Sequence, residues 1–270
     1  MKKTEKINKI RKIIDDEIEN FIKKFETKYE KQVNKSNGII NMKKNNFFIS
    51  ELGEEFMFYS AFVRSFDSSL GNTLQNIGNS IAGLTYEVKS KIDGYILPEQ
   101  HQYINSLMHS YQIKDHDPKV SHYNNFTCIT PKNIDSYKMS LNTDNYFYDK
   151  KNKKHYLIEL KASGHLDSKK SKSEKISLLQ QYFLLKNSLI GTDETVEIFF
   201  ATAYNKFGEN NDWKPNTVLQ FIAPEELLIG KKYWDFCCGF EDGFEIVFDQ
   251  YKKNAEKIKD AFDRIKNMYF

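Results

Sequence analysis

The stretch from Asn142 to Lys161 (NTDNYFYDKKNKKHYLIELK) constrains the fold more than any other part of the chain. Two short runs rich in aromatic and branched residues flank the charged segment 149–154, and this pattern predicts a β-hairpin. Residues two apart on a strand project from the same face, so Glu159 and Lys161 share one face. An antiparallel turn then brings Asp144 beside Glu159. The sequence therefore predicts that two carboxylates and one ammonium group converge.

This trio of side chains has the chemistry of a metal-dependent phosphodiesterase. Asp144 and Glu159 can hold Mg²⁺, because hard cations prefer oxygen ligands. Lys161 can orient a water molecule or stabilise the charge on a phosphate. Glu-x-Lys also occurs at 26–28, within a helical pattern, and at 87–89, with no Asp-led strand before it. The alternative reading of the trio is a solvated strand edge, where charges discourage aggregation.

Composition excludes several classes of protein. The 270 residues suit one large domain, or one domain with a helical annex, and 40% apolar content allows a sizeable core. A net charge of +3 means that any anion-binding face must come from local clustering. Three cysteines without a disulfide framework (Cys128, Cys237 and Cys238) favour a reducing, cytoplasmic location. The start MKKTEKINKI has no apolar segment behind it, and no run of 18 apolar residues follows, which argues against secretion and membrane insertion.

Hydrophobic periodicity and turn residues predict the order of the elements. Helices are expected at 4–33, 51–66, from Ser68 or Ser69 to 82, 97–111, after Ser171, from Pro224, and at 240–270. Strands are expected at 85–95 with a turn at Asp93-Gly94, at 123–134 with a loop, in the hairpin, at 195–204 and at 217–223. This order predicts a mixed α/β (α+β) fold, in which a mixed β-sheet is flanked by helices on both faces. We expect residues 1–50 to form a helical cover or dimerisation segment and 51–270 to form the main domain.

Two groups of side chains could contact an anion at a helix start. Ser68 or Ser69 can cap a helix, and with Arg64 they could touch a phosphate there; helix packing is the alternative. The second group surrounds a capping box formed by Ser171 and Glu174 and would flank a phosphate held by the metal, unless it is only a solvated loop. Its members are Lys169, Lys170, Lys172 and Lys175.

A polar loop at 205–216 could read base edges, because Asn and Lys side chains do so. The candidates are Asn205, Lys206, Asn210, Asn211 and Lys214, with a solvated loop as the alternative. The histidines His109, His116 and His122 lack the tight, paired spacing of a zinc site.

The hairpin, with the helix and buried strand after it, resembles the PD-(D/E)xK nuclease fold. Four blocks in order are similar to TdeIII-type type II restriction endonucleases, and together they run from Arg64 to the C-terminus: RSFDSSLGNTLQNIG, YLIELKASGHLDSKKSKSEK, FFATAYNKFGE and LLIGKKYWDFCCG. The resemblance implies Mg²⁺-dependent cleavage of double-stranded DNA by a homodimer, with Asp144, Glu159 and Lys161 as catalytic residues. It also implies a target of the GGNCC kind and a DNA methyltransferase as partner in the system.

One position departs from the pattern of this family. Related nucleases often place a Glu of the preceding helix in the metal site, and the corresponding residue here is Gln75. An amide oxygen is a weaker ligand for a hard cation. Either Gln75 supports the metal site, or another acid such as Glu54, Glu55 or Asp149 completes it.

Two other functions remain open from the sequence. A structure-reading or repair nuclease of the same fold would cleave without sequence preference. A non-catalytic DNA-binding or nuclease-inhibitor module could keep the fold without the chemistry, although the intact trio argues against it.

Overall fold

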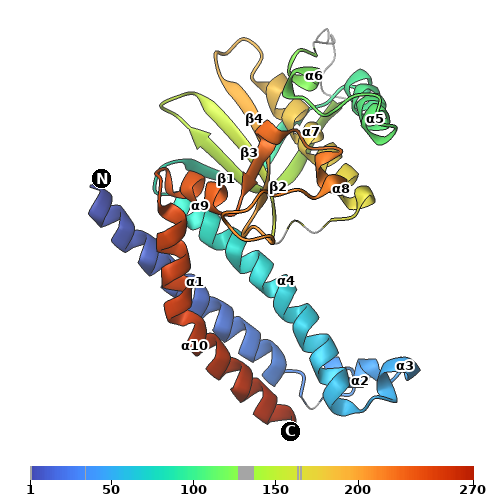
Figure 1. Cartoon of the computed structure of the whole chain (residues 1–270), viewed down its shortest axis with the longest axis vertical. Helices are drawn as coiled ribbons and strands as arrows, with labels where there is room; N and C mark the ends of the chain where they lie inside the picture. The colour runs from blue at the N-terminus through green and yellow to red at the C-terminus, as the bar shows by residue number, and fades with distance from the viewer. Residues whose placement is uncertain (1, 34, 127–136, 163, 165) are drawn as a thin grey trace. The chain divides into compact units, whose positions relative to one another are not determined.

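The computed structural model describes residues 2–33, 35–126, 137–162, 164 and 166–270 and contains two structural units (Figure 1). The helical unit comprises the chain up to Ile77 together with Glu245–Phe270, and the sheet unit comprises Gly78–Phe244. The boundaries fall inside helices α4 (Glu54–Ala82) and α10 (Gly243–Tyr269), so each of these helices contributes to both units.

The helical unit consists of α1 (Lys3–Glu30), α2 (Ile39–Lys43), α3 (Phe47–Ser50), most of α4 and most of α10. The apolar stripe of α1 is buried, from Ile10 to Tyr29. Its aromatic residues meet those of α4 and α10: the ring of Phe25 lies 5.4 Å from that of Phe62 and 6.0 Å from that of Phe262. Amphipathic helices bury such stripes against one another, which explains this bundle.

The sheet unit is built on five strands in the order β1-β2-β3-β4-β5. They are β1 (Glu87–Tyr95), β2 (Lys138–Asp149), β3 (Lys154–Lys161), β4 (Thr195–Thr202) and β5 (Leu227–Ile229). The first three are antiparallel, whereas β3, β4 and β5 run parallel. The predicted hairpin is confirmed as β2 and β3, with a longer first strand than expected, and the predicted parallel strand is confirmed as β4.

Helices cover both faces of this sheet. On one face α5 (Pro98–Gln112), α6 (Val120–Asn124) and α7 (Ser168–Ser188) pack around Tyr146 and Leu157. On the other face α9 (Lys231–Cys238) places Phe236 against Phe147 and Tyr156, with ring separations of 6.4 and 4.9 Å. The predicted fold class, a mixed sheet flanked by helices on both faces, is therefore confirmed.

Several element predictions were wrong. Helix α4 is continuous through Ser68 and Ser69, because apolar residues keep the helical spacing across them. Strand β1 does not turn at Asp93-Gly94 but pairs on with β2. A Cβ at Gly94 would collide with the backbone oxygen of Leu184, so this glycine permits the close approach of α7.

The segment expected to be a strand at 217–223 is instead the short helix α8 (Asn216–Leu219), followed by the 3₁₀ turn η2 (Pro224–Glu226). The helix expected after Pro224 is thus limited to this turn. Of the strand and loop expected at 123–134, Tyr123 belongs to α6, and 127–134 lie outside the described residues. Among the helices that the structure describes, none has the length and apolar character needed to cross a membrane.

Candidate active site

The β2–β3 hairpin places Asp144 and Glu159 next to each other. Asn145 pairs with Ile158, and the same register continued by one residue sets Asp144 opposite Glu159. Glu159 also pairs with Phe200 of β4, so it lies on an interior strand, and its residue is only 8% exposed. An interior strand holds this carboxylate in one fixed position.

Lys161 lies between two carboxylates. Its Nζ is 2.5 Å from Oε1 of Glu159 and 3.1 Å from Oε1 of Glu174. Glu174 comes from the second turn of α7, the helix that packs on this face of the sheet. The hairpin and α7 together therefore fix the position of the ammonium group.

The electrostatics of this group favour a bound cation. Burial, together with the negative charge of Asp144, raises the pKa of Glu159 to about 8, although Lys161 acts in the opposite direction. Burial lowers the pKa of Lys161, but Glu159 and Glu174 outweigh it, so the net shift is upward. The single positive charge of Lys161 does not balance the negative charges of Asp144, Glu159 and Glu174.

Asp144 and Glu159 provide the kind of oxygen donors that Mg²⁺ prefers. The described residues contain no group of three or more His, Cys, Asp or Glu side chains placed to hold a metal together. Two carboxylates fit Mg²⁺, because this ion keeps several water ligands and needs only one or two carboxylates from the protein.

Of the residues considered for completing the metal site, Asp149 is excluded. Its carboxylate accepts hydrogen bonds from the backbone nitrogens of Lys151 and Asn152, at the far end of the hairpin. Five residues of strand separate it from Asp144, which is about 17 Å. Gln75, Glu54 and Glu55 lie in the helical unit, and their part in a metal site stays a prediction.

Asn79 is a residue of this site that the sequence did not reveal. From α4 its Nδ2 donates to the backbone oxygen of Asp144 at 3.1 Å, and its Oδ1 accepts from Nδ2 of Asn145 at 2.7 Å. Its position directly after the block RSFDSSLGNTLQNIG was the only available signal. The amide thus fixes the backbone that carries Asp144.

Glu174 was assigned a different role from the sequence. The predicted capping box with Ser171 is wrong, because α7 begins earlier, at Ser168. The actual cap is Asp167, whose Oδ1 accepts from the backbone nitrogen of Lys170 at 2.8 Å. This leaves the carboxylate of Glu174 free of any capping role and available to Lys161.

The lysines around the start of α7 differ in exposure. Lys175 is completely buried and forms an ion pair with Glu226, so its predicted phosphate contact is wrong. Lys172 is partly buried and donates to Oε1 of Gln112 at 2.7 Å. Lys169 and Lys170 are exposed, and their contact with DNA stays a prediction.

The loop after β4 contains one residue that is not available to DNA. Asn205 is buried, and its side chain bonds to the backbone oxygen of Asn211 and the backbone nitrogen of Phe207. It shapes the loop, and the prediction that it reads bases is wrong. Lys206 and Lys214, together with the exposed Asn210 and Asn211, remain candidates.

The predicted phosphate site at a helix start, with Arg64, Ser68 and Ser69, loses its basis because these residues lie within the continuous α4. Arg64 and Ser68 are exposed and Ser69 is partly buried. Their contact with DNA stays a prediction without support from a helix N-terminus.

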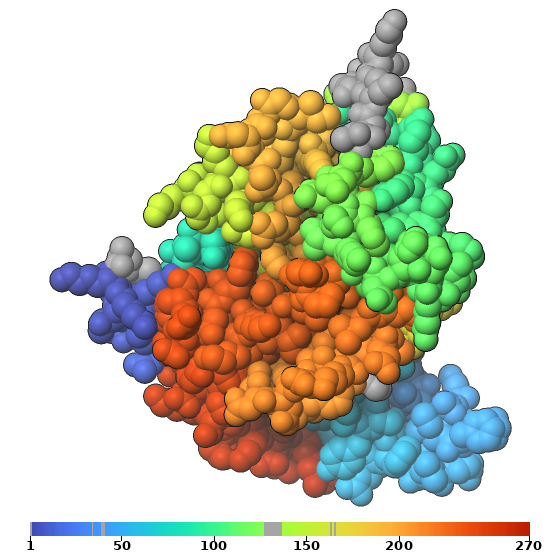
Figure 2. All heavy atoms as spheres, turned by 45° about the horizontal axis from the view of Figure 1, so that its top comes forward, coloured from blue at the N-terminus to red at the C-terminus, as the bar shows by residue number. Residues whose placement is uncertain are grey.

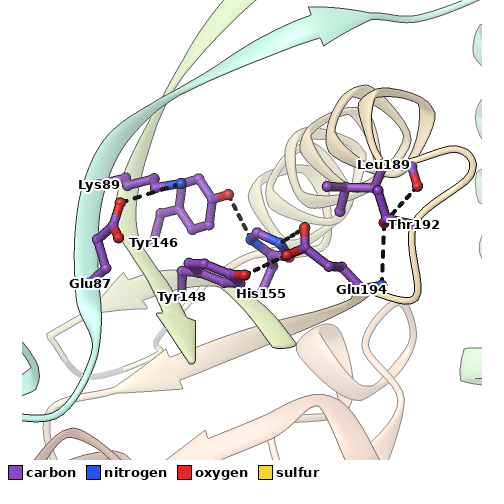
Figure 3. Close-up of polar contacts among 8 residues, drawn as sticks. All are labelled: Glu87, Lys89, Tyr146, Tyr148, His155, Leu189, Thr192 and Glu194. Carbon is purple, nitrogen blue, oxygen red and sulfur yellow. Dashed lines mark hydrogen bonds and ion pairs between the residues drawn. The ribbon is translucent and has the colours of Figure 1, made fainter. Parts of the chain in front are cut away.

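A second polar cluster braces the opposite end of the hairpin (Figure 3). His155 of β3 lies between Tyr146, 2.8 Å from its Nδ1, and Glu194, 3.1 Å from its Nε2. Tyr148 also donates to Glu194, and Lys89 lies over both tyrosine rings. Because Glu194 precedes β4, this cluster ties the loop after α7 to the hairpin and keeps the strands in register.

Comparisons with known proteins give the family. No curated protein matches this chain. The resemblance to TdeIII-type enzymes in particular is not confirmed, whereas a type II restriction endonuclease is supported. The model of the family described as "Type II restriction endonuclease, HinfI" matches residues 6–255, which is nearly the whole chain. The chain therefore belongs to the HinfI family of type II restriction endonucleases, which are site-specific deoxyribonucleases.

Proposed function

We propose that this chain hydrolyses phosphodiester bonds of double-stranded DNA at a short specific sequence, with Mg²⁺ held by Asp144 and Glu159. One observation carries the proposal. A buried strand sets Glu159 against the charge of Asp144 and holds its Oε1 2.5 Å from the ammonium group of Lys161. Carboxylates crowded in this way are stabilised by a divalent cation.

The residues divide the chemistry between them. Mg²⁺ would polarise a phosphoryl oxygen and lower the pKa of a bound water. Lys161 positions the attacking water and offsets the negative charge that develops on phosphorus. Glu174, 3.1 Å from Nζ of Lys161, keeps this ammonium group charged and in place.

The DNA backbone would lie along basic residues near the site. Lys169 and Lys170, exposed at the start of α7, follow the catalytic strand directly and are the first candidates for phosphate contacts. Lys206 and Lys214 follow β4, which is adjacent to that strand, and could extend the contact.

The target and partners follow from the chemistry of cutting both strands. The part of the chain that the structure describes carries one such centre, which would cut one strand, so two chains related by a two-fold axis suit a palindrome. We propose a homodimer and a short palindrome interrupted by one base, of which GGNCC is the example that the sequence resemblance implies. A DNA methyltransferase would protect the same sequence in the host.

Digestion of plasmid DNA tests this proposal. With Mg²⁺ the protein should give discrete bands, and sequencing their ends should give one common sequence. Glu159→Gln should abolish cleavage while still binding DNA in Ca²⁺. Glu197→Gln is the matched control, because Glu197 also lies on a strand of this sheet and pairs with a lysine, Lys154, at 2.7 Å.

Other outcomes of the digestion would contradict the proposal. A smear instead of bands would indicate a nuclease without sequence preference. Absence of cleavage by the unaltered protein over a range of divalent ions would indicate a non-catalytic DNA-binding module. Normal cleavage by Glu159→Gln would show that the site lies elsewhere.

A further inference from the structure

The first half of α4 is apolar on two faces. Met57, Phe58 and Phe62 are buried within the helical unit. Phe56, Tyr59 and Val63 follow the same helical spacing on another face, yet they are exposed to between 37% and 54%. A helix that is apolar on two faces is normally covered on both. Among the described residues, Lys266 of α10 hydrogen-bonds Tyr59, but this face of α4 stays largely exposed.

The short helices before α4 enlarge this exposed face. Met42 of α2, Phe47 and Phe48 of α3, and Leu52 in the turn are exposed to between 60% and 74%. The rings of Phe47 and Phe48 lie 3.8 Å apart. An ion pair of 3.8 Å between Lys44 and Glu54 holds the end of α2 beside the first turn of α4.

These seven side chains form what we call the apolar patch: Met42, Phe47, Phe48, Leu52, Phe56, Tyr59 and Val63. Figure 2 shows the segment that carries them, in light blue, at the surface.

The area of the apolar patch matches that of a protein–protein interface. With about 150–250 Å² for each large side chain and roughly half of it exposed, the patch presents on the order of 700 Å² of apolar surface. The largest such patch on a typical monomer is about 300–600 Å², whereas each partner in a stable complex buries about 800 Å². The patch therefore has the size of one half of a stable interface.

The charges around the apolar patch indicate what kind of partner covers it. The charged residues here are three lysines and three glutamates: Lys43, Lys44, Glu51, Glu54 and Glu55 between residues 43 and 55, and Lys266 of α10, which hydrogen-bonds Tyr59. Equal numbers of acidic and basic residues give DNA phosphates and anionic lipid no net attraction. A second copy of the same chain offers both signs of charge. Across a two-fold axis, the lysines at 43 and 44 of one copy can face the glutamates at 51, 54 and 55 of the other.

We propose that the apolar patch is the surface through which two copies of this chain form the dimer. This inference deepens the proposed function, which needs two catalytic centres for one double-strand break. The patch lies on the helical unit, so the dimer forms through a surface other than the hairpin that carries the catalytic residues.

Measurement of mass in solution tests the interface. The unaltered chain should have twice its mass of 31.8 kDa in sedimentation equilibrium. Phe47→Ser combined with Phe48→Ser should raise the dimer dissociation constant about 30-fold or more, as removal of central aromatic side chains does. Ile113→Ser combined with Ile190→Ser is the matched control, because both isoleucines are also 60% exposed but lie in the sheet unit, and it should remain dimeric.

The result can be separated from that of the proposed function. Mass does not depend on cleavage, and Glu159→Gln should be as dimeric as the unaltered protein. A monomeric unaltered chain at tens of micromolar, or a Phe47/Phe48 variant with an unchanged dimer dissociation constant, would overturn the interface even if DNA is cut. If circular dichroism shows that this variant does not fold, the same measurement is made on Leu52→Lys combined with Val63→Lys, which should also weaken the dimer. Loss of DNA binding in Ca²⁺ without a change of mass would show that the apolar patch contacts DNA.

Discussion

The side-chain amide of Asn79 donates a hydrogen bond to the backbone oxygen of Asp144, with 3.1 Å between Nδ2 and that oxygen. Oδ1 of the same amide accepts a hydrogen bond from Nδ2 of Asn145, and Asn145 is fully buried. A helix residue thus fixes the backbone oxygen of a proposed metal ligand and the side chain of the residue that follows it. Residues that support metal ligands in this way typically contribute to metal affinity.

We expect Asn79→Ala to raise the Mg²⁺ concentration needed for half-maximal cleavage by about 10- to 100-fold. The reason is that Asp144 loses its support, while DNA binding in Ca²⁺ should stay within about twofold of normal. Asn152→Ala is the control, because Asn152 lies in the turn at the opposite end of the same hairpin. Equal Mg²⁺ dependence for both variants would show that the amide of Asn79 does not position Asp144.

Glu174→Gln tests the second partner of Lys161. Removal of this carboxylate, 3.1 Å from Nζ, should lower the single-turnover cleavage rate by roughly tenfold without changing DNA affinity. Because Glu174 helps to raise the pKa of Lys161, the alkaline limb of the pH–rate profile should move to lower pH. A profile identical to that of the Glu197→Gln control would mean that Glu174 is only a surface neighbour.

The sequence could predict those parts of this site whose residues lie close together along the chain. The hairpin was predictable because strand propensity and turn residues are local, and its register followed from the turn. Asn79 was not, because 65 residues separate it from Asp144 and only tertiary packing brings them together. Glu174 matched a local capping pattern, but Asp167 supplied a cap four residues before Ser171.

The fold shows the same division between local and tertiary information. The break predicted at Ser68 relied on residues that favour caps, yet the apolar spacing of α4 continued and determined the outcome. The strand predicted at 217–223 was a short apolar run, which periodicity alone cannot distinguish from a helical turn. By contrast, β4 was long and apolar enough to be predicted as a buried parallel strand.

The raised pKa of Glu159 predicts how the metal-free protein responds to pH. The folded chain holds a proton on Glu159 up to about pH 8, whereas the unfolded chain releases it near 4.5. Between these values the folded state binds more protons, so the free energy of unfolding falls as pH rises.

Unfolding by urea at pH 5 and pH 8 checks this. Between these two pH values the unaltered protein should lose about 1–3 kcal/mol more of its free energy of unfolding than Glu159→Gln. Saturating Mg²⁺ should restore stability at pH 8 in the unaltered protein and not in the variant. If the free energy of unfolding changes equally with pH in the two proteins, the pKa of Glu159 is not raised.

The buried ion pair between Lys175 and Glu226 gives a prediction that separates structural from DNA-binding lysines. Tyr123 also donates to Oε1 of Glu226, at 2.7 Å, so the carboxylate depends on both partners. Lys175→Met should destabilise the protein by about 3–5 kcal/mol, because it leaves a buried charge unpaired. Lys175→Met combined with Glu226→Gln should recover most of that loss, which urea unfolding measures.

The exposed lysines of the same helix should behave in the opposite way. Lys169→Met combined with Lys170→Met should change the free energy of unfolding by no more than about 0.5 kcal/mol, because neither side chain is buried. The same variant should weaken DNA binding in Ca²⁺ and lower the slope of log affinity against log salt by about one for each phosphate that a lysine no longer neutralises. If instead Lys175→Met keeps full stability and loses DNA affinity, its ammonium group faces DNA, and the division between these lysines is wrong.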